Sequence, residues 1–383
     1  MDDSKIKKSA HISSIFCMVI TIAYSLTLMC LYTNQLALDA PVEFDIFGHI
    51  EFGLSGSRSD SIMFPILAFL WKFSDYRVFL IALILTIFSI LSIFLTYFLL
   101  KNHIENIARR HLYLLSFICN IYMPIHVPFF NASPYAGMLG FNVWHNSTYI
   151  AMKPFAVLSI ILFFKLIKTP SIESISIAKF IYFSGSLFIA SLFKLSFAFG
   201  FIPCFLIIII VDFIERKKKG ALKYILFGAT VLPTVLLMIW QKTQLFDQTN
   251  ELGFEFLKAW MIYADSPLIS LVLSLAFPIV VLIFNFKDVI KDTIYKFSWL
   301  FAVFNVLIFA FLYEAGPRME HGNFGWGAHF ASGILFVISI YKLLEKIKNV
   351  SKFRLAFISA ILGMHILCGV NYIIRFLSTN AYL

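Results

Sequence analysis

The chain has 383 residues, of which 60% are hydrophobic and only 14% are charged, and its mean hydropathy is +0.86. Because a soluble domain typically carries roughly a quarter of its residues as charged side chains, this composition excludes a water-soluble protein. The net charge of +10 lies mostly in short connections between apolar segments, where it sets membrane topology and attracts anionic lipid, so nucleic acid is not an expected partner.

Apolar segments long enough to cross a bilayer, which takes ~20 residues, recur along the whole chain without a separate soluble domain. We therefore predict an all-α fold: a polytopic transmembrane helical bundle of about eleven spans, with residues 1–383 forming a single integral membrane domain. The expected spans are 11–33, 77–100, 111–130, 149–168, 178–193, 196–214, 223–240, 267–286, 294–313, 328–345 and 355–375.

The distribution of lysine and arginine predicts the orientation, because positively charged short loops are retained in the cytoplasm. With a cytoplasmic N-terminus, 22 of the 31 basic residues lie on the cytoplasmic side, and 12 of the 21 acidic residues lie on the opposite side. We therefore expect the chemistry in outer loops, which lie near 34–76, 131–148, 241–266 and 314–327.

The first outer loop contains Asp39, Asp45 and His49, followed by the apolar stretch 62–73, which is too short to span. Such a stretch is expected to lie along the membrane surface. If 44–54 is helical, Asp45 and His49 share one face. A carboxylate beside an imidazole can transfer protons, and a solvated ion pair gives the same pattern.

The second outer loop is rich in groups that bind or stack on sugars, among them Trp144, His145 and Asn146. Aromatic rings offer apolar faces to the CH-rich faces of sugars, while Asn and His reach hydroxyls. The same residues also make an ordinary aromatic belt at a membrane interface. The sequence supports both interpretations.

Lys194 interrupts an apolar run at the junction of the expected spans 178–193 and 196–214. We expect it in a tight outer turn. A lysine at this position can extend its ammonium group to the interface, or it can bind a phosphate as a compact positive charge.

The densest polar cluster lies in 314–327, where four glycines and a proline surround charged and aromatic side chains. Glycine allows the backbone to approach a ligand closely, and Arg318 can bind phosphate or carboxylate through two parallel hydrogen bonds. Alternatively, Arg318 pairs with Glu314 or Glu320 and stiffens a turn. The other candidates in this cluster are His321, Asn323 and Trp326.

The five cysteines lie inside expected spans at no metal-ligand spacing, and the chain has no phosphate-binding glycine loop. No metal or cofactor is therefore expected.

Ionisable residues inside the spans are scarce, with His365 and Asp212 the nearest candidates, and no repeat relates the two halves. This scarcity argues against an ion-coupled pump. A flippase or other transporter of a lipid-linked saccharide remains the non-enzymatic alternative.

The number of spans, the basic inner face and the early surface loop with Asp39, Glu43 and Asp45 resemble the membrane glycosyltransferases of the GT-C superfamily. The resemblance covers most of the chain at the level of topology. It implies a polyprenyl-phosphate sugar as donor and a first-loop carboxylate as base, which is matched by Asp45 or Asp39. The chain also resembles O-antigen and capsule polymerases, which join polyprenyl-diphosphate-linked repeat units and use outer-loop arginines; Arg318 and Arg58 are the candidates here.

Both resemblances imply the inner membrane of a bacterium, a polyprenyl-(di)phosphate-linked saccharide and membrane lipid as partners, and other polysaccharide-assembly proteins nearby. The expected catalytic residues are Asp45, Asp39 and His49. The expected substrate-binding residues are Arg318, Lys194, Trp144, His145, Asn146, Glu320, His321, Asn323 and Trp326.

Overall fold

The computed structural model describes residues 3–37, 45–104, 107–169, 176–215, 221–245, 251–289, 291–316 and 318–379. The chain is 77% helical, which confirms the nearly all-α prediction. In the described part, strands are limited to β1 (Leu252–Phe254) and β2 (Leu312–Glu314), which pair antiparallel.

Eight described helices are long and apolar enough to cross a membrane, and the bent pair α10–α11 raises the number to nine if it is one span. These two helices meet at 62°, within the expected span 267–286. Helix α7 is apolar but shorter. The eight helices are α1 (Asp3–Gln35), α4 (Arg77–Lys101), α6 (Ser147–Lys168), α8 (Ser196–Glu215), α9 (Ala221–Leu245), α12 (Thr293–Phe311), α13 (Gly325–Lys346) and α14 (Lys352–Thr379). The remaining elements are α2 (Asp45–Ser55), α3 (Met63–Trp71), α5 (Arg109–Cys119), α7 (Ile177–Phe193), η2 (Trp260–Ile262), α10 (Pro267–Ser274), α11 (Ala276–Val289), η3 (Met319–His321) and η4 (Ile347–Asn349).

The expected span 111–130 is wrong, because helix α5 ends at Cys119. A helix that continued to Pro124 would lose a backbone donor there and clash with the carbonyl of Asn120. The chain instead continues to α6 as an irregular and largely buried segment. Its backbone is satisfied by distant groups: Met123 N donates to the carbonyl of His365 at 3.1 Å, and His365 Nδ1 donates to the carbonyl of Met123 at 2.8 Å. Irregular backbone is tolerated inside a membrane where protein surrounds it in this way.

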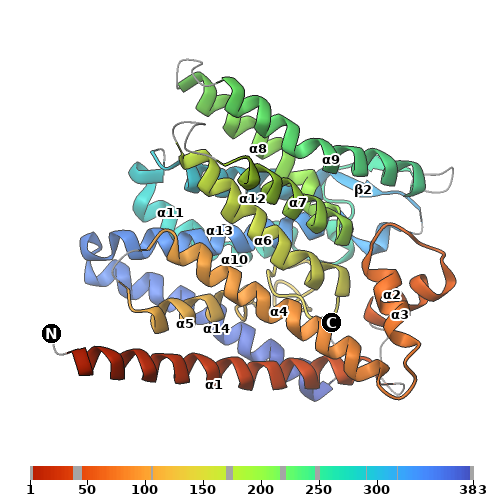
Figure 1. Cartoon of the computed structure of the whole chain (residues 1–383), viewed down its shortest axis with the longest axis horizontal. Helices are drawn as coiled ribbons and strands as arrows, with labels where there is room; N and C mark the ends of the chain where they lie inside the picture. The colour runs from red at the N-terminus through yellow and green to blue at the C-terminus, as the bar shows by residue number, and fades with distance from the viewer. Residues whose placement is uncertain are drawn as a thin grey trace.

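Helices α13 and α6 form the centre of the bundle. In their apolar stretches, 94% of the residues of α13 and 78% of those of α6 are buried, against 17% for α1. Helix α1 lies along one side of the bundle and the pair α8–α9 along the other (Figure 1). Close packing in the centre depends on Gly333 of α13, because a Cβ atom there would lie 1.9 Å from the ring of Phe141. The irregular segment that contains Phe141 is therefore pressed directly onto the central helix.

The short helices α2 and α3 pack against each other at one end of the bundle, beside the start of α6 (Figure 1). Residues 44–54 are helical from Asp45 on, and the apolar stretch 62–73 forms a helix, Met63–Trp71, that is too short to span. Gly53 allows the contact, since a Cβ atom there would lie 2.1 Å from the carbonyl oxygen of Phe64. This close contact holds the C-terminal end of α2 against α3.

Candidate functional site

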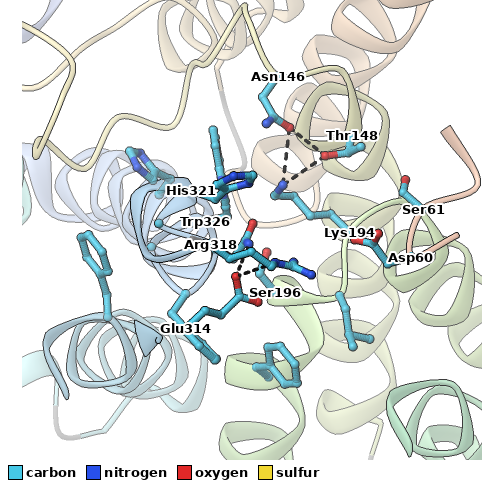
Figure 2. A pocket seen from close by; sticks show the side chains of 18 of the residues that line it. Asp60, Ser61, Asn146, Thr148, Lys194, Ser196, Glu314, Arg318, His321 and Trp326 are labelled. Atoms are coloured by element: carbon cyan, nitrogen blue, oxygen red, sulfur yellow. Dashed lines mark hydrogen bonds and ion pairs between the residues drawn. The ribbon is translucent and has the colours of Figure 1, made fainter. Parts of the chain in front are cut away.

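A cavity of about 1550 Å³ opens at the end of the bundle that holds α2 and α3. It is lined by α2, the turn between α7 and α8, the residues before α6, η3 and the start of α13 (Figure 2). Segments from all four expected outer loops therefore meet in one place. The predicted site residues that line it are Asp45, His49, His145, Asn146, Lys194, Arg318, Glu320, His321, Asn323 and Trp326.

Two predicted site residues are not placed in the cavity. Asp39 lies outside the described residues. Trp144 is only 3% exposed and is absent from the cavity lining; its indole N–H donates to the hydroxyl of Tyr24 at 3.3 Å, and its ring stacks on Tyr372. In this structure Trp144 packs the bundle behind the cavity.

Asn146 organises one wall of the cavity. Its side-chain oxygen accepts the backbone N–H of Tyr149 at 3.0 Å and so caps the first turn of α6. Its Nδ2 donates to Asp45 Oδ2 at 2.7 Å, and its oxygen also accepts from Lys194 Nζ at 3.5 Å. One amide thus holds a carboxylate and an ammonium group on the same side of the cavity.

Lys194 lies in the predicted tight turn, between the end of α7 and the start of α8. Figure 2 shows its side chain reaching toward Asn146 and Thr148; Nζ donates to the Thr148 hydroxyl at 3.1 Å and lies 4.5 Å from the centre of the Trp326 ring. Burial lowers the pKa of Lys194 to about 8, although the charge of Asp45 acts in the opposite direction. The amine therefore changes charge close to physiological pH.

Asp45 is ionised in this setting. Burial raises its pKa, but His145, His49, the hydrogen bond from Asn146 and the charge of Lys194 lower it, and the net pKa lies below its ordinary value. The cavity therefore presents a carboxylate at neutral pH.

The two histidines nearest Asp45 are neutral at the same pH. Burial lowers the pKa of His49 to about 3 and that of His145 to about 4, although Asp45 opposes both shifts. His49 does not bond directly to Asp45 among the described contacts; its Nδ1 lies 2.7 Å from the Ser147 hydroxyl. Neutral imidazoles offer one donor and one acceptor each, which suits binding of hydroxyl groups.

The two arginines of the cavity are engaged with acids. Arg58 forms two hydrogen bonds to the carboxylate of Asp60, at 2.8 and 2.6 Å. Arg318 Nε donates to Glu314 Oε2 at 3.1 Å (Figure 2). Asn323 Nδ2 donates to the same oxygen at 2.6 Å. The pairing that stiffens the 314–327 turn is therefore present.

Lys194 differs from these arginines, because the ion pairs between described residues include none for it. Lys242 also lines the cavity without an ion pair between described residues, but Lys194 is the cation held beside Asn146 and Asp45, so it is the one available to an anionic ligand there.

An aromatic wall completes the cavity. Trp326 lies one helical turn before His329 on α13, with ring centres 5.5 Å apart, and Tyr135 lies between the rings of His329 and His145, at 5.8 and 4.6 Å. His329 Nδ1 lies 3.0 Å from the carbonyl of Gly140, to which it must donate, so in the neutral ring Nε2 is an acceptor.

His329 was not among the predicted site residues, because it falls inside an expected span. Its spacing of three from Trp326, which places both side chains on one helix face, is the signal that could have identified it.

Among the described residues, no group of three or more His, Cys, Asp and Glu side chains is arranged to hold a metal ion. The wall instead combines an ionised carboxylate, an amine that titrates near neutrality, neutral imidazoles and the largely buried indole of Trp326. Such a set can accept a proton, bind an anion and stack on a sugar.

No family model, curated protein or solved structure matches this chain.

Proposed function

We propose that this chain is a membrane glycosyltransferase of the GT-C type. It transfers a sugar from a polyprenyl phosphate to an acceptor hydroxyl at the outer face of a bacterial inner membrane, in cell-surface polysaccharide synthesis. One observation carries the proposal: Asn146 holds the carboxylate of Asp45 and the ammonium group of Lys194 together in a large cavity. Glycosyl transfer from a phosphate needs both kinds of group.

In the proposed step, the acceptor hydroxyl gives its proton to Asp45 while its oxygen bonds to the anomeric carbon of the donor sugar. The bond from that carbon to the phosphate oxygen breaks, and its electron pair leaves with the polyprenyl phosphate. Positive charge develops on the sugar ring, as in other glycosyl transfers, and the nearby carboxylate stabilises it. Lys194 stabilises the negative charge that grows on the leaving phosphate.

The remaining lining residues fit the sugar in this proposal. Trp326 offers a ring face, and the neutral imidazoles of His49 and His145 bind hydroxyls. The ion pair of Arg318 with Glu314 shapes the opposite wall, together with the carboxamide of Asn323.

Purified protein in liposomes, supplied with a radiolabelled polyprenyl-phosphate hexose and a lipid-linked acceptor, tests the proposal. Asp45→Asn keeps the shape of the side chain but removes the base, and we expect it to lower kcat by roughly a hundredfold or more. Asp75→Asn is the matched control, because Asp75 is an exposed carboxylate outside the cavity. Transfer at the wild-type rate by Asp45→Asn would refute the proposed role.

The size of the cavity favours a second candidate, a repeat-unit polymerase. A volume of about 1550 Å³ exceeds the ~300–1,000 Å³ of ordinary ligand pockets, and Arg58 and Arg318 both line it. The same assay separates the two functions through product length: a single-sugar transferase stops after one addition, whereas a polymerase supplied with a polyprenyl-diphosphate repeat unit gives a ladder of products.

A further inference from the structure

The cavity has two chemically distinct parts. The polar chamber contains Asp45, His145, Asn146, Lys194 and Trp326. A second part, which we name the apolar arm, extends from it along three helices. The apolar arm is lined by Phe199, Ile202 and Pro203 of α8, Val235, Met238 and Ile239 of α9, and Phe304 and Ile308 of α12.

Helix α8 connects the two parts. Lys194 lies two residues before the start of α8, and the lining then continues along the helix to Pro203, a rise of roughly 10 Å from Ser196. Helices α9 and α12 both pack against α8, so α8 forms the floor of the arm and the other two helices form its walls. The ammonium group of Lys194 therefore lies at the junction between the chamber and the arm.

The arm opens toward the lipid-facing side of the bundle. Ile239 lines it and is nevertheless 58% exposed, while Met238 and Ile308 are half-buried. On the same outer surface of α9, Leu232 and Leu236 are exposed, as expected of a helix that faces lipid. A long apolar chain can therefore pass from the bilayer into the arm without crossing water.

We propose that the apolar arm binds the isoprenoid chain of the carrier lipid, which enters sideways between α9 and α12. This inference rests on the proposed function and assigns an orientation to its substrate. The phosphate lies at Lys194, the sugar extends into the polar chamber toward Asp45, and the first isoprene units follow α8 to Pro203. A water-soluble donor would leave the apolar lining wet, whereas an isoprenoid chain covers it.

Photolabelling of the full-length protein in nanodiscs tests the arm without requiring turnover. The probe is a polyprenyl phosphate that carries a diazirine on its first isoprene units and no sugar. We expect crosslinks to residues of the arm, competed by unlabelled undecaprenyl phosphate and not by phosphatidylglycerol. Equal competition by phosphatidylglycerol would show an ordinary phospholipid site and overturn the inference.

Filling the arm gives the second readout. Ile308→Trp places an indole in the arm, and we expect at least a tenfold loss of labelling. Leu307→Trp is the matched control, because Leu307 is the next residue of α12 but is absent from the cavity lining and 47% exposed. Met238→Trp obstructs the arm from the opposite wall, so the test does not depend on the folding of one variant. Undiminished labelling of folded protein by both arm variants would overturn the inference.

The glycosyltransferase proposal and the proposed isoprenoid site can be refuted independently of each other. If the wild-type protein is labelled in the arm but transfers no sugar, the glycosyltransferase proposal is wrong and the lipid site stands. If transfer occurs and Ile308→Trp reduces it equally for an undecaprenyl donor and for a donor that carries a methyl group in place of the isoprenoid chain, the arm does not hold the chain. We expect the defect to be confined to the undecaprenyl donor.

Discussion

Replacing Asn146 by aspartate should move the pH optimum of the reaction upward. The new carboxylate can still cap α6 and still accept from Lys194, because both contacts use a side-chain oxygen. The amide nitrogen that donates to Asp45 at 2.7 Å is lost, however, and a second negative charge takes its place. Two carboxylates at this distance raise the pKa of at least one of them.

The size of the shift follows from the geometry. If the two carboxylates relax to a separation of ~4 Å, their repulsion is about 4 kcal/mol at an effective dielectric constant of ~20. At 1.36 kcal/mol per pKa unit, this corresponds to a rise of about three units, shared between the two acids. Asp45 then takes up its proton at a higher pH than in the wild type, and the added charge also raises the pKa of Lys194. The acidic and the basic limb of the pH–activity profile should therefore both move to higher pH.

The assay is the dependence of kcat/KM on pH in proteoliposomes. Wild-type activity should be flat through the weakly acidic range and fall above about pH 8, where Lys194 loses its proton. The Asn146→Asp variant should lose activity at a higher pH than the wild type on the acidic side and keep it to a higher pH on the basic side. Asn323→Asp is the control, because Asn323 also donates to a carboxylate, that of Glu314, at 2.6 Å. If the profiles of Asn146→Asp and wild type superimpose, the assignment of Asp45 as base is wrong.

Three further predictions concern individual residues. Lys194→Arg should retain activity above about pH 8, since arginine stays charged there, whereas Lys194→Ala should lower kcat/KM by roughly a hundredfold at neutral pH. Trp326→Ala should raise KM by up to about tenfold with a smaller effect on kcat, because it removes a stacking face; an unchanged KM would exclude Trp326 from the sugar site. Gly333→Ala should destabilise the fold by about 1–3 kcal/mol, visible as a lower Tm in detergent, because its Cβ atom overlaps Phe141.

Helix positions could be predicted where a local pattern determines them. The length of the apolar runs identified the membrane helices, and the break at Lys194 identified the turn between α7 and α8. The sequence indicated that Asp45 and His49 share one face if 44–54 is helical, and α2 is that helix, although His49 bonds to Ser147 instead of to Asp45. These features depend on residues close together in the chain, which is why the sequence alone predicts them.

The irregular segment after α5 could not be predicted, because its stability comes from partners far along the chain. Its apolar composition is that of a span, yet its backbone is satisfied by His365, 242 residues away from Met123, and by the side chain of Asn142. The position of Trp144 could not be predicted for the same reason. An indole in a loop suits a sugar site or a packed interior equally well, and in the structure its contact with the distant Tyr24 places it in the interior. The Arg318–Glu314 pair, in contrast, follows a spacing of four residues and was among the expected arrangements.

The most direct test of the account is a structure of the protein bound to a non-hydrolysable polyprenyl-phosphonate hexose in nanodiscs. We expect the sugar between Asp45 and Trp326, with the phosphonate within hydrogen-bonding distance of Lys194 Nζ. A ligand bound with its phosphonate away from Lys194, or with its sugar out of reach of Asp45, would contradict it.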